Sequence, residues 1–161
     1  MRSFSLERDA LLRRRDPLGP GRRLALSALT DEWLKGLFYS IGRAGADLCL
    51  VAVGGYGRQE LAPGSDIDLL LLHRKSAAAV APLADKIWYP IWDTGISLDH
   101  SVRTPAEARR LASEDIKVVL GLLDTRVIAG DGTLAEQLRQ TVFADWRAMA
   151  IKRLPTLREL V

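Results

Sequence analysis

The chain has 161 residues and a formal net charge of +3 at pH 7, with 48% hydrophobic and 27% charged residues. These values are typical of one soluble globular domain and exclude a second domain of similar size. No apolar run approaches the roughly 20 residues of a membrane span, and the single cysteine, Cys49, excludes an intrachain disulfide framework. We therefore expect a cytoplasmic protein.

Hydrophobic periodicity predicts alternating helices and strands over the first two thirds of the chain. Apolar residues at three- and four-residue steps indicate amphipathic helices, and short apolar runs between breakers indicate buried strands. The expected elements are a helix over 5–15, a helix over 24–41, a strand over 48–53, a strand over 67–72, a helix over 78–92 and a strand over 96–103. Trp88 and Trp92 are expected to lie in the core.

From Thr104 onward only helices are expected. Thr104 is a suitable N-cap with Glu107 three residues later, which is the pattern of a capping box. Ser113 is predicted to cap the next helix, which should run to Gly130. A last helix is expected over 134–154.

This order of elements predicts a mixed α/β (α+β) domain in which helices flank a small mixed sheet. We expect an N-terminal helical extension over 1–45, a core over 46–131 and a C-terminal helical segment over 132–161. Because the last segment stops inside an amphipathic pattern without a capping glycine, we expect the chain to be part of a longer protein.

The arginine distribution bears on possible partners. Seven arginines fall within the first 23 residues, and a basic cluster of this kind can contact nucleic acid. No nucleic-acid-binding motif accompanies the cluster. We therefore predict a solvated helix face and no nucleic-acid partner.

The stretch VGGYGRQELAPGSDIDLLLL, residues 53–72, carries two carboxylates in a strand. Because side chains alternate along a strand, Asp66 and Asp68 point to one face, with Cα atoms roughly 6.6 Å apart. Two buried carboxylates are unfavourable unless they share a cation. Magnesium prefers carboxylates together with substrate phosphates, so the pair predicts a metal-dependent phosphoryl-transfer site.

Gly54 and Gly55 precede this pair and have no side chains, so their N–H groups can approach an anionic ligand. The residues YGRQEL are expected to begin a helix whose N-terminus favours phosphate, and Arg58 is a candidate phosphate contact. The pattern is neither a Walker loop nor a dinucleotide-binding fingerprint. A Gly-Gly turn or a D-x-D pair alone is usually structural, but their order and spacing here favour nucleotide binding or catalysis.

Three stretches resemble the N-terminal nucleotidyltransferase domain of the bifunctional uridylyltransferase/uridylyl-removing enzymes, which modify the nitrogen-regulatory PII protein. They are GGYGRQELAPGSDIDLL, WYPIWDTGISLDHSVRT and SEDIKVVLGLLDTRVIAGD, and together they cover about residues 50–131. That domain is similar to the DNA polymerase beta-type nucleotidyltransferases. The resemblance therefore implies a small mixed sheet of the polymerase-beta type.

The resemblance also implies a reaction and its ligands. Members of the family transfer a nucleotidyl group from a nucleoside triphosphate to a tyrosine hydroxyl of PII and release pyrophosphate. The transferred group is either UMP from UTP or AMP from ATP. The sequence does not choose between them, because the residues that contact the base carry no motif. Gly54 and Gly55 match the residues that hold the triphosphate. Asp66 and Asp68 match those that hold Mg²⁺, with Mn²⁺ as an alternative.

Four further residues receive expectations. Asp99 is the candidate for a third carboxylate, because its strand should lie next to the strand of Asp68. Ser65 either touches a phosphate or caps the turn. Arg103 either binds phosphate or caps the following helix. His100 is expected to face the opposite side of its strand as a structural residue.

Full-length members of the family also carry a phosphohydrolase domain that removes the nucleotidyl group. His73 and His100 are the only histidines, so we expect this chain to lack the removing activity. Two other functions remain open, namely a nucleotide-binding regulatory module without chemistry and a nucleotidyltransferase acting on a small molecule. The intact Asp66 and Asp68 argue against the first, and the family-specific stretches argue against the second.

Overall fold

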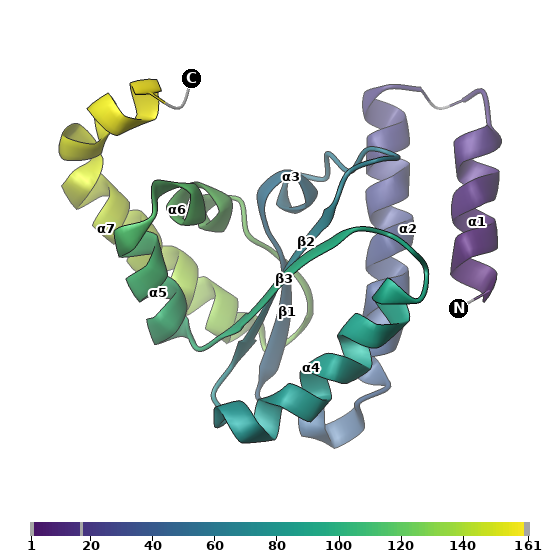
Figure 1. Cartoon of the computed structure of the whole chain (residues 1–161), viewed down its shortest axis with the longest axis horizontal. Helices are drawn as coiled ribbons and strands as arrows, with labels where there is room; N and C mark the ends of the chain where they lie inside the picture. The colour runs from purple at the N-terminus through teal and green to yellow at the C-terminus, as the bar shows by residue number, and fades with distance from the viewer. Residues whose placement is uncertain (1, 17, 160–161) are drawn as a thin grey trace.

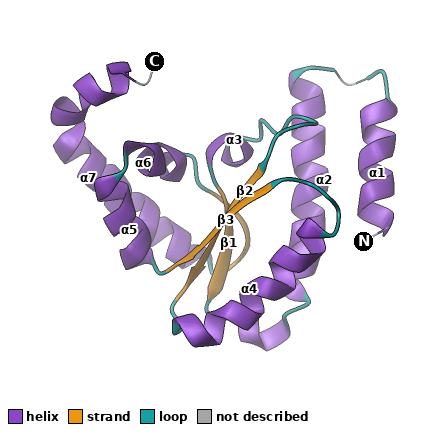
Figure 2. Ribbon diagram, viewed as in Figure 1, coloured by secondary structure: helices purple, strands orange, loops and turns teal. Residues whose placement is uncertain are grey.

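The computed structural model describes residues 2–16 and 18–159 (Figure 1). Its strands are β1 Leu48–Ala52, β2 Ile67–His73, β3 Leu98–Arg103 and β4 Arg126–Gly130. Its helices are α1 Arg2–Arg13, α2 Pro20–Tyr39, the 3₁₀ turn η1 Gly42–Gly45, α3 Gly54–Gly57, α4 Ala77–Trp92, α5 Pro105–Glu114, α6 Ile116–Leu123 and α7 Gly132–Glu159 (Figure 2).

The strands form one sheet in the order β3-β2-β1-β4. β1 pairs antiparallel with both β2 and β4, whereas β2 pairs parallel with β3. β3 and β4 are therefore the edges of a small mixed sheet. The predicted mixed α/β fold is confirmed.

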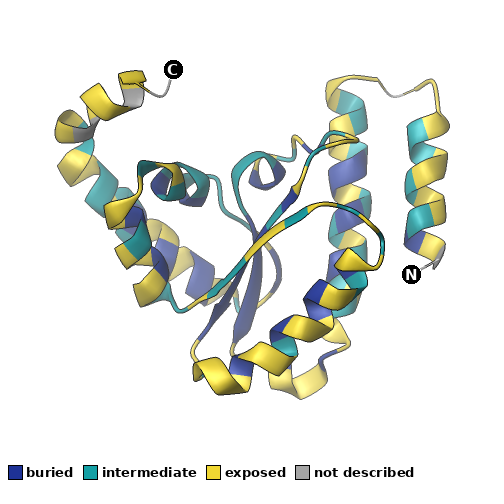
Figure 3. Cartoon of the chain, in the orientation of Figure 1, coloured by how far each residue is buried: buried dark blue, intermediate teal, exposed yellow. Residues whose placement is uncertain are grey.

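Helices cover both faces of the sheet, which explains the unbroken apolar run of β2. Alternate residues of that strand belong to two separate apolar clusters. Leu69 and Leu71 pack with α2 and α4 on one face, and Leu70 and Leu72 pack with α5, α6 and α7 on the other. Figure 3 shows the central strands buried between these two layers. α1 packs outside α2, where the rings of Phe4 and Trp33 stack at 4.0 Å.

The expected elements up to residue 103 are present with small shifts at their ends. The capping box of Thr104 and Glu107 is confirmed, because each makes the predicted side-chain contact with the backbone of the other. The expectation for Ser113 is wrong. The cap of α6 is Asp115, whose carboxylate accepts a hydrogen bond from the backbone N–H of Lys117 at 2.8 Å.

Two expectations about the last third of the chain are also wrong. The helix predicted to reach Gly130 ends at Leu123, and residues 126–130 form β4 beside β1 instead. The final helix, expected to end at residue 154, continues through Pro155 to Glu159. Among the residues that the structure describes, no helix has both the length and the apolar character needed to span a membrane.

Candidate active site

Two carboxylates lie side by side at paired positions of neighbouring strands. Asp68 is the second residue of β2 and Asp99 the second residue of β3, and their Cα positions are partners in the parallel pairing. Paired residues of adjacent strands point to the same face of a sheet. Asp66 lies just before β2 and is exposed. Burial, followed by the charges of Asp99 and Asp66, raises the pKa of the half-buried Asp68 above its ordinary value.

Gly54 lies directly against this carboxylate. Its φ of +56° is a left-handed conformation that favours glycine, and a Cβ there would be 3.3 Å from Oδ2 of Asp68. The backbone N–H of Val53 donates to the carbonyl of Asp68 at 3.1 Å. The end of β1 is therefore fixed beside the start of β2, with the first glycine of the pair against the carboxylate.

A cleft of about 440 Å³ lies next to these residues, between the sheet and helices α5 and α6. Its polar walls come from Gly54, Asp68, Asp99, Ser101 and Arg103. α6 contributes a further cation, Lys117. The cleft thus has carboxylates and basic side chains on its walls, which is the arrangement expected around a metal-bound polyphosphate.

Of the predicted site residues, the cleft brings together Gly54, Asp68 and Asp99. Gly55, Arg58, Ser65 and Asp66 are not among its lining residues. Lys117 was missed, because its contribution depends on how α6 packs over the sheet. A possible signal was its position inside the family-like stretch SEDIKVVLG.

Arg58 and Ser65 have local partners in this structure. Arg58 forms ion pairs with Asp124 at 2.7 Å and Glu60 at 2.9 Å. The Oγ of Ser65 accepts a hydrogen bond from the backbone N–H of Ala62 at 2.9 Å. The second of the two alternatives for Ser65, a contact that caps the turn, is therefore the contact that the structure contains.

The helix expected from YGRQEL consists of one turn only. α3 covers four residues, Gly54–Gly57, and Gln59 follows with a φ of 60°. Such a short segment aligns too few peptide dipoles to act as an extended helix N-terminus. Its glycines serve close packing as well, because a Cβ on Gly57 would lie 1.9 Å from the carbonyl oxygen of Asp124.

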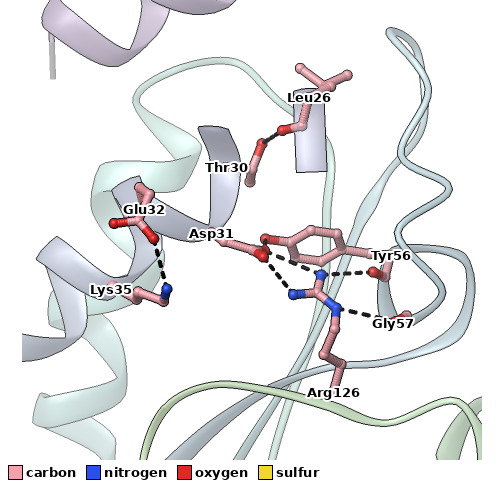
Figure 4. A network of polar contacts seen from close by, with 8 residues as sticks. All are labelled: Leu26, Thr30, Asp31, Glu32, Lys35, Tyr56, Gly57 and Arg126. Atoms are coloured by element: carbon pink, nitrogen blue, oxygen red, sulfur yellow. Dashed lines mark hydrogen bonds and ion pairs between the residues drawn. The ribbon is translucent and has the colours of Figure 1, made fainter. Parts of the chain in front are cut away.

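A partly buried polar network holds the glycine turn in place (Figure 4). Tyr56, in α3, is 1% exposed, and its hydroxyl donates to Asp31 of α2 at 2.6 Å. Arg126 of β4 pairs with the same aspartate and donates to the carbonyls of Tyr56 and Gly57 at 3.1 and 3.2 Å. Burial, and then the bond to Asp31, raises the pKa of Tyr56. Hydrogen bonds and an ion pair in this partly buried network therefore connect the turn to α2 and β4.

His100 points to the other face of the sheet, as predicted. Its ring lies 5.1 Å from that of Trp88 and 5.3 Å from that of Trp92, both on α4. Trp88 is buried, but the expectation that Trp92 lies in the core is wrong, since Trp92 is 43% exposed. His73 is 4% exposed, and its Nδ1 accepts the backbone N–H of Lys75 at 3.2 Å.

The carboxylates offer the donors that a hard divalent cation prefers. No set of three or more His, Cys, Asp or Glu side chains within the described residues is arranged to hold a metal by itself. Mg²⁺ commonly uses only one or two carboxylates together with substrate phosphates and water. Burial first, and then repulsion from Asp99 and Asp66, raises the pKa of Asp68, and a cation would relieve this repulsion. Asp68 and Asp99 therefore fit a metal that a triphosphate helps to coordinate.

Two solved structures share this fold. A crystal structure of a toxin–antitoxin with AMP-PNP matches 78% of this chain and 97% of its own, with a TM-score of 0.50 and 14% identity. A second toxin–antitoxin structure, a mutant with two aspartates one residue apart changed to glutamate, matches 81% of this chain with a TM-score of 0.50 and 12% identity. At 14% and 12% identity these likenesses show the fold that the two structures share with this chain.

Curated relatives of higher identity share one name. The bifunctional uridylyltransferase/uridylyl-removing enzyme of Streptomyces coelicolor is 60% identical over 143 residues, which cover 88% of this chain and 17% of that protein. The enzyme of the same name from Mycobacterium tuberculosis is 44% identical over 147 residues, or 90% of this chain and 18% of that protein. The chain is a homologue of one segment of these bifunctional enzymes, and it spans less than a fifth of their length. No family model matches the chain.

Proposed function

We propose that the chain transfers a nucleotidyl group, UMP from UTP or AMP from ATP, to a tyrosine of the PII protein and releases pyrophosphate. The observation that carries the proposal is the in-register pair of Asp68 and Asp99 beside Gly54 in one cleft. The relatives' name, uridylyltransferase, supports UTP as the donor. The toxin–antitoxin structure with AMP-PNP, which has the same fold, supports a triphosphate ligand.

In this proposal the carboxylates, the glycine and the basic residues of the cleft have different roles. Asp68 and Asp99 would hold a divalent cation, Mg²⁺ or Mn²⁺, which when bound supplies positive charge beside the triphosphate. Gly54 leaves its backbone free to approach a phosphate. Arg103 and Lys117, which also line the cleft, would hold the leaving pyrophosphate by charge-assisted hydrogen bonds.

The bond changes follow from the two substrates. The tyrosine oxygen forms a bond to the α-phosphorus, and the bond from that phosphorus to the bridging oxygen of pyrophosphate breaks. The hydroxyl proton leaves to Asp99, which is exposed at the cleft. Most of the rate gain is expected from alignment of the tyrosine oxygen with the phosphorus.

Gly55, Arg58, Ser65 and Asp66 remain proposed site residues. For Arg58 to reach a phosphate, it would have to leave its ion pairs with Asp124 and Glu60. We further propose that the chain is cytoplasmic and acts within the predicted core over 46–131. It would lack the removing activity, since His73 and His100 are its only histidines.

Mass spectrometry of PII tests this function. PII is incubated with the chain, Mg²⁺ and either UTP or ATP, and a gain of one nucleotidyl group on a tyrosine is expected with one of them. Asp68→Asn should reduce transfer by more than about a hundredfold, because even partners one step removed from a metal contribute 10- to 100-fold. The matched control is Asp85→Asn, at an exposed position on α4, which should keep full transfer.

The outcomes separate the competing functions. Transfer that survives in Asp68→Asn would show that the carboxylate assignment is wrong. Nucleotide binding without transfer by the unaltered chain would favour a regulatory module. Transfer to a small hydroxyl compound but not to PII would favour the third function.

A further inference from the structure

The cleft beside Asp68 has walls of two kinds. The sheet contributes most of its polar side chains, namely Asp68, Asp99, Ser101 and Arg103. Helices α5 and α6 contribute Lys117 and the apolar residues Leu111, Val118 and Leu122. A nucleoside triphosphate has the same division between a charged and a largely apolar half. We propose, on the basis of the proposed function, that the apolar residues of α5 and α6 receive the nucleobase and that Gly121 leaves the room for it.

Gly121 faces the cleft from α6. It is four residues after Lys117, so the two positions lie on one face of the helix about 6 Å apart along its axis. Both line the cleft. A Cβ on Gly121 would meet no atom within 4 Å. The absent side chain thus leaves open space beside the apolar residues of the cleft, one helical turn from Lys117.

The helix does not need glycine at this position. Gly121 lies inside α6, where glycine is less favourable than almost any other residue, and its φ is not positive. Close packing does not require it either, in contrast to Gly57. A cleft of about 440 Å³ is within the size range of small-ligand sites. Space kept for a bound ligand accounts for the glycine where helix stability and packing do not.

The test is to fill the space and measure nucleotide binding. Gly121→Leu is compared with Gly36→Leu, because Gly36 also lies inside a helix, α2, and its Cβ would likewise meet no atom within 4 Å. Gly36 lies outside the cleft. Calorimetry with Mg²⁺ and a non-hydrolysable analogue of UTP or ATP, without PII, gives the dissociation constant. We expect it to rise at least tenfold in Gly121→Leu and to stay unchanged in Gly36→Leu.

Folding is checked in the same variants. Both are expected to have a melting temperature at or above that of the original chain, because leucine is the better helix former. Gly121→Ala is a smaller filling that should weaken binding less than leucine does. A folded Gly121→Leu that binds the analogue with unchanged affinity would overturn the proposal.

Inorganic tripolyphosphate separates this inference from the proposed function. Its binding with Mg²⁺ should be equal in the original chain and Gly121→Leu, because it has no base. A similar loss of tripolyphosphate and nucleotide binding would contradict a base site. If the original chain binds the nucleotide and Gly121→Leu does not, the base site stands even when no transfer to PII occurs. Failure of the original chain to bind any nucleotide would overturn both.

Discussion

Strand β2 contributes residues to both faces of the sheet, but the two sets of residues have different surroundings. Toward α2 and α4, β2 presents Ile67, Leu69 and Leu71, which are all buried in one apolar cluster. Toward α5, α6 and α7, it presents Asp68 and then Leu70 and Leu72. On the first face the residues of β2 are buried throughout. The second is apolar at one end and opens into the cleft at the other.

This difference shows how a small fold combines stability with a charged site. Period-two alternation lets one residue change on one face without altering the other. The cost of the carboxylate is local, and it appears in the raised pKa of Asp68. On the face toward α2 and α4, by contrast, the residues of β2 belong to the apolar core, and we call this the closed face of β2. Three predictions examine this contrast.

The closed face should give the largest effect on stability. Leu71→Ala removes a side chain that is fully buried, and we expect a loss of about 3 kcal/mol in the free energy of unfolding, with a melting temperature lower by about 10 °C. Urea unfolding followed by circular dichroism measures it. The control is Leu24→Ala on α2, where the leucine is 51% exposed. A Leu71→Ala loss as small as the control's would mean that this face is not tightly packed.

The glycine turn at the end of the sheet should give an intermediate effect. Gly57→Ala would bring a Cβ to 1.9 Å from the carbonyl oxygen of Asp124, so the backbone must shift. We expect a loss of about 1–3 kcal/mol. Gly55→Ala is the matched control, because its Cβ would be 3.8 Å from Nη2 of Arg58, an ordinary contact. Thermal unfolding compares the two, and equal losses would contradict the close approach of the turn to Asp124.

A substitution on the open face, Asp68→Asn, should have the smallest effect on stability, and that effect should depend on pH. Because the pKa of Asp68 is raised by folding, the folded chain holds this proton more tightly than the unfolded chain does. The folded state therefore loses stability as the pH rises through the folded pKa. Asp68→Asn removes the charge, so it should be more stable than the original chain at pH 7, by less than about 1 kcal/mol at this half-exposed site.

The advantage of Asp68→Asn should shrink as the pH falls and vanish near the ordinary carboxyl pKa of about 4. Melting temperatures of both chains at pH 7 and pH 4, without divalent cations, measure the difference. An original chain that is the more stable one at pH 7 would show that folding does not disfavour the charge. Added Mg²⁺ should raise the melting temperature of the original chain more than that of the variant.

Local patterns were enough to predict most elements before residue 104. The apolar runs that became β1 and β2 lie between glycine and proline breakers, and Thr104 with Glu107 forms a cap from adjacent residues alone. β4 was not predictable in this way. Its residues 126–130 continue the apolar spacing of α6, and only pairing with β1 makes them a strand.

The site residues likewise separate into those that local sequence predicts and those that depend on tertiary packing. Asp68 and Gly54 could be proposed from one contiguous stretch, and Asp99 from the expectation of a neighbouring strand. Lys117 and Gly121 become relevant only because α6 packs over the cleft, a tertiary arrangement that no local spacing encodes. Arg58 could be proposed from its place next to the glycine turn, but one of its two ion-pair partners, Asp124, lies far along the chain. Local sequence does not predict that pair.

The network around Tyr56 has a consequence for how this chain can be divided. Its members Asp31, Tyr56 and Arg126 come from three distant parts of the sequence. A shortened chain beginning at residue 46 would keep every motif by which the family was recognised. It would lose Asp31, and with it the acceptor shared by a buried phenol and a guanidinium. The conformation of the glycine turn thus depends in part on α2, a helix that carries none of those motifs.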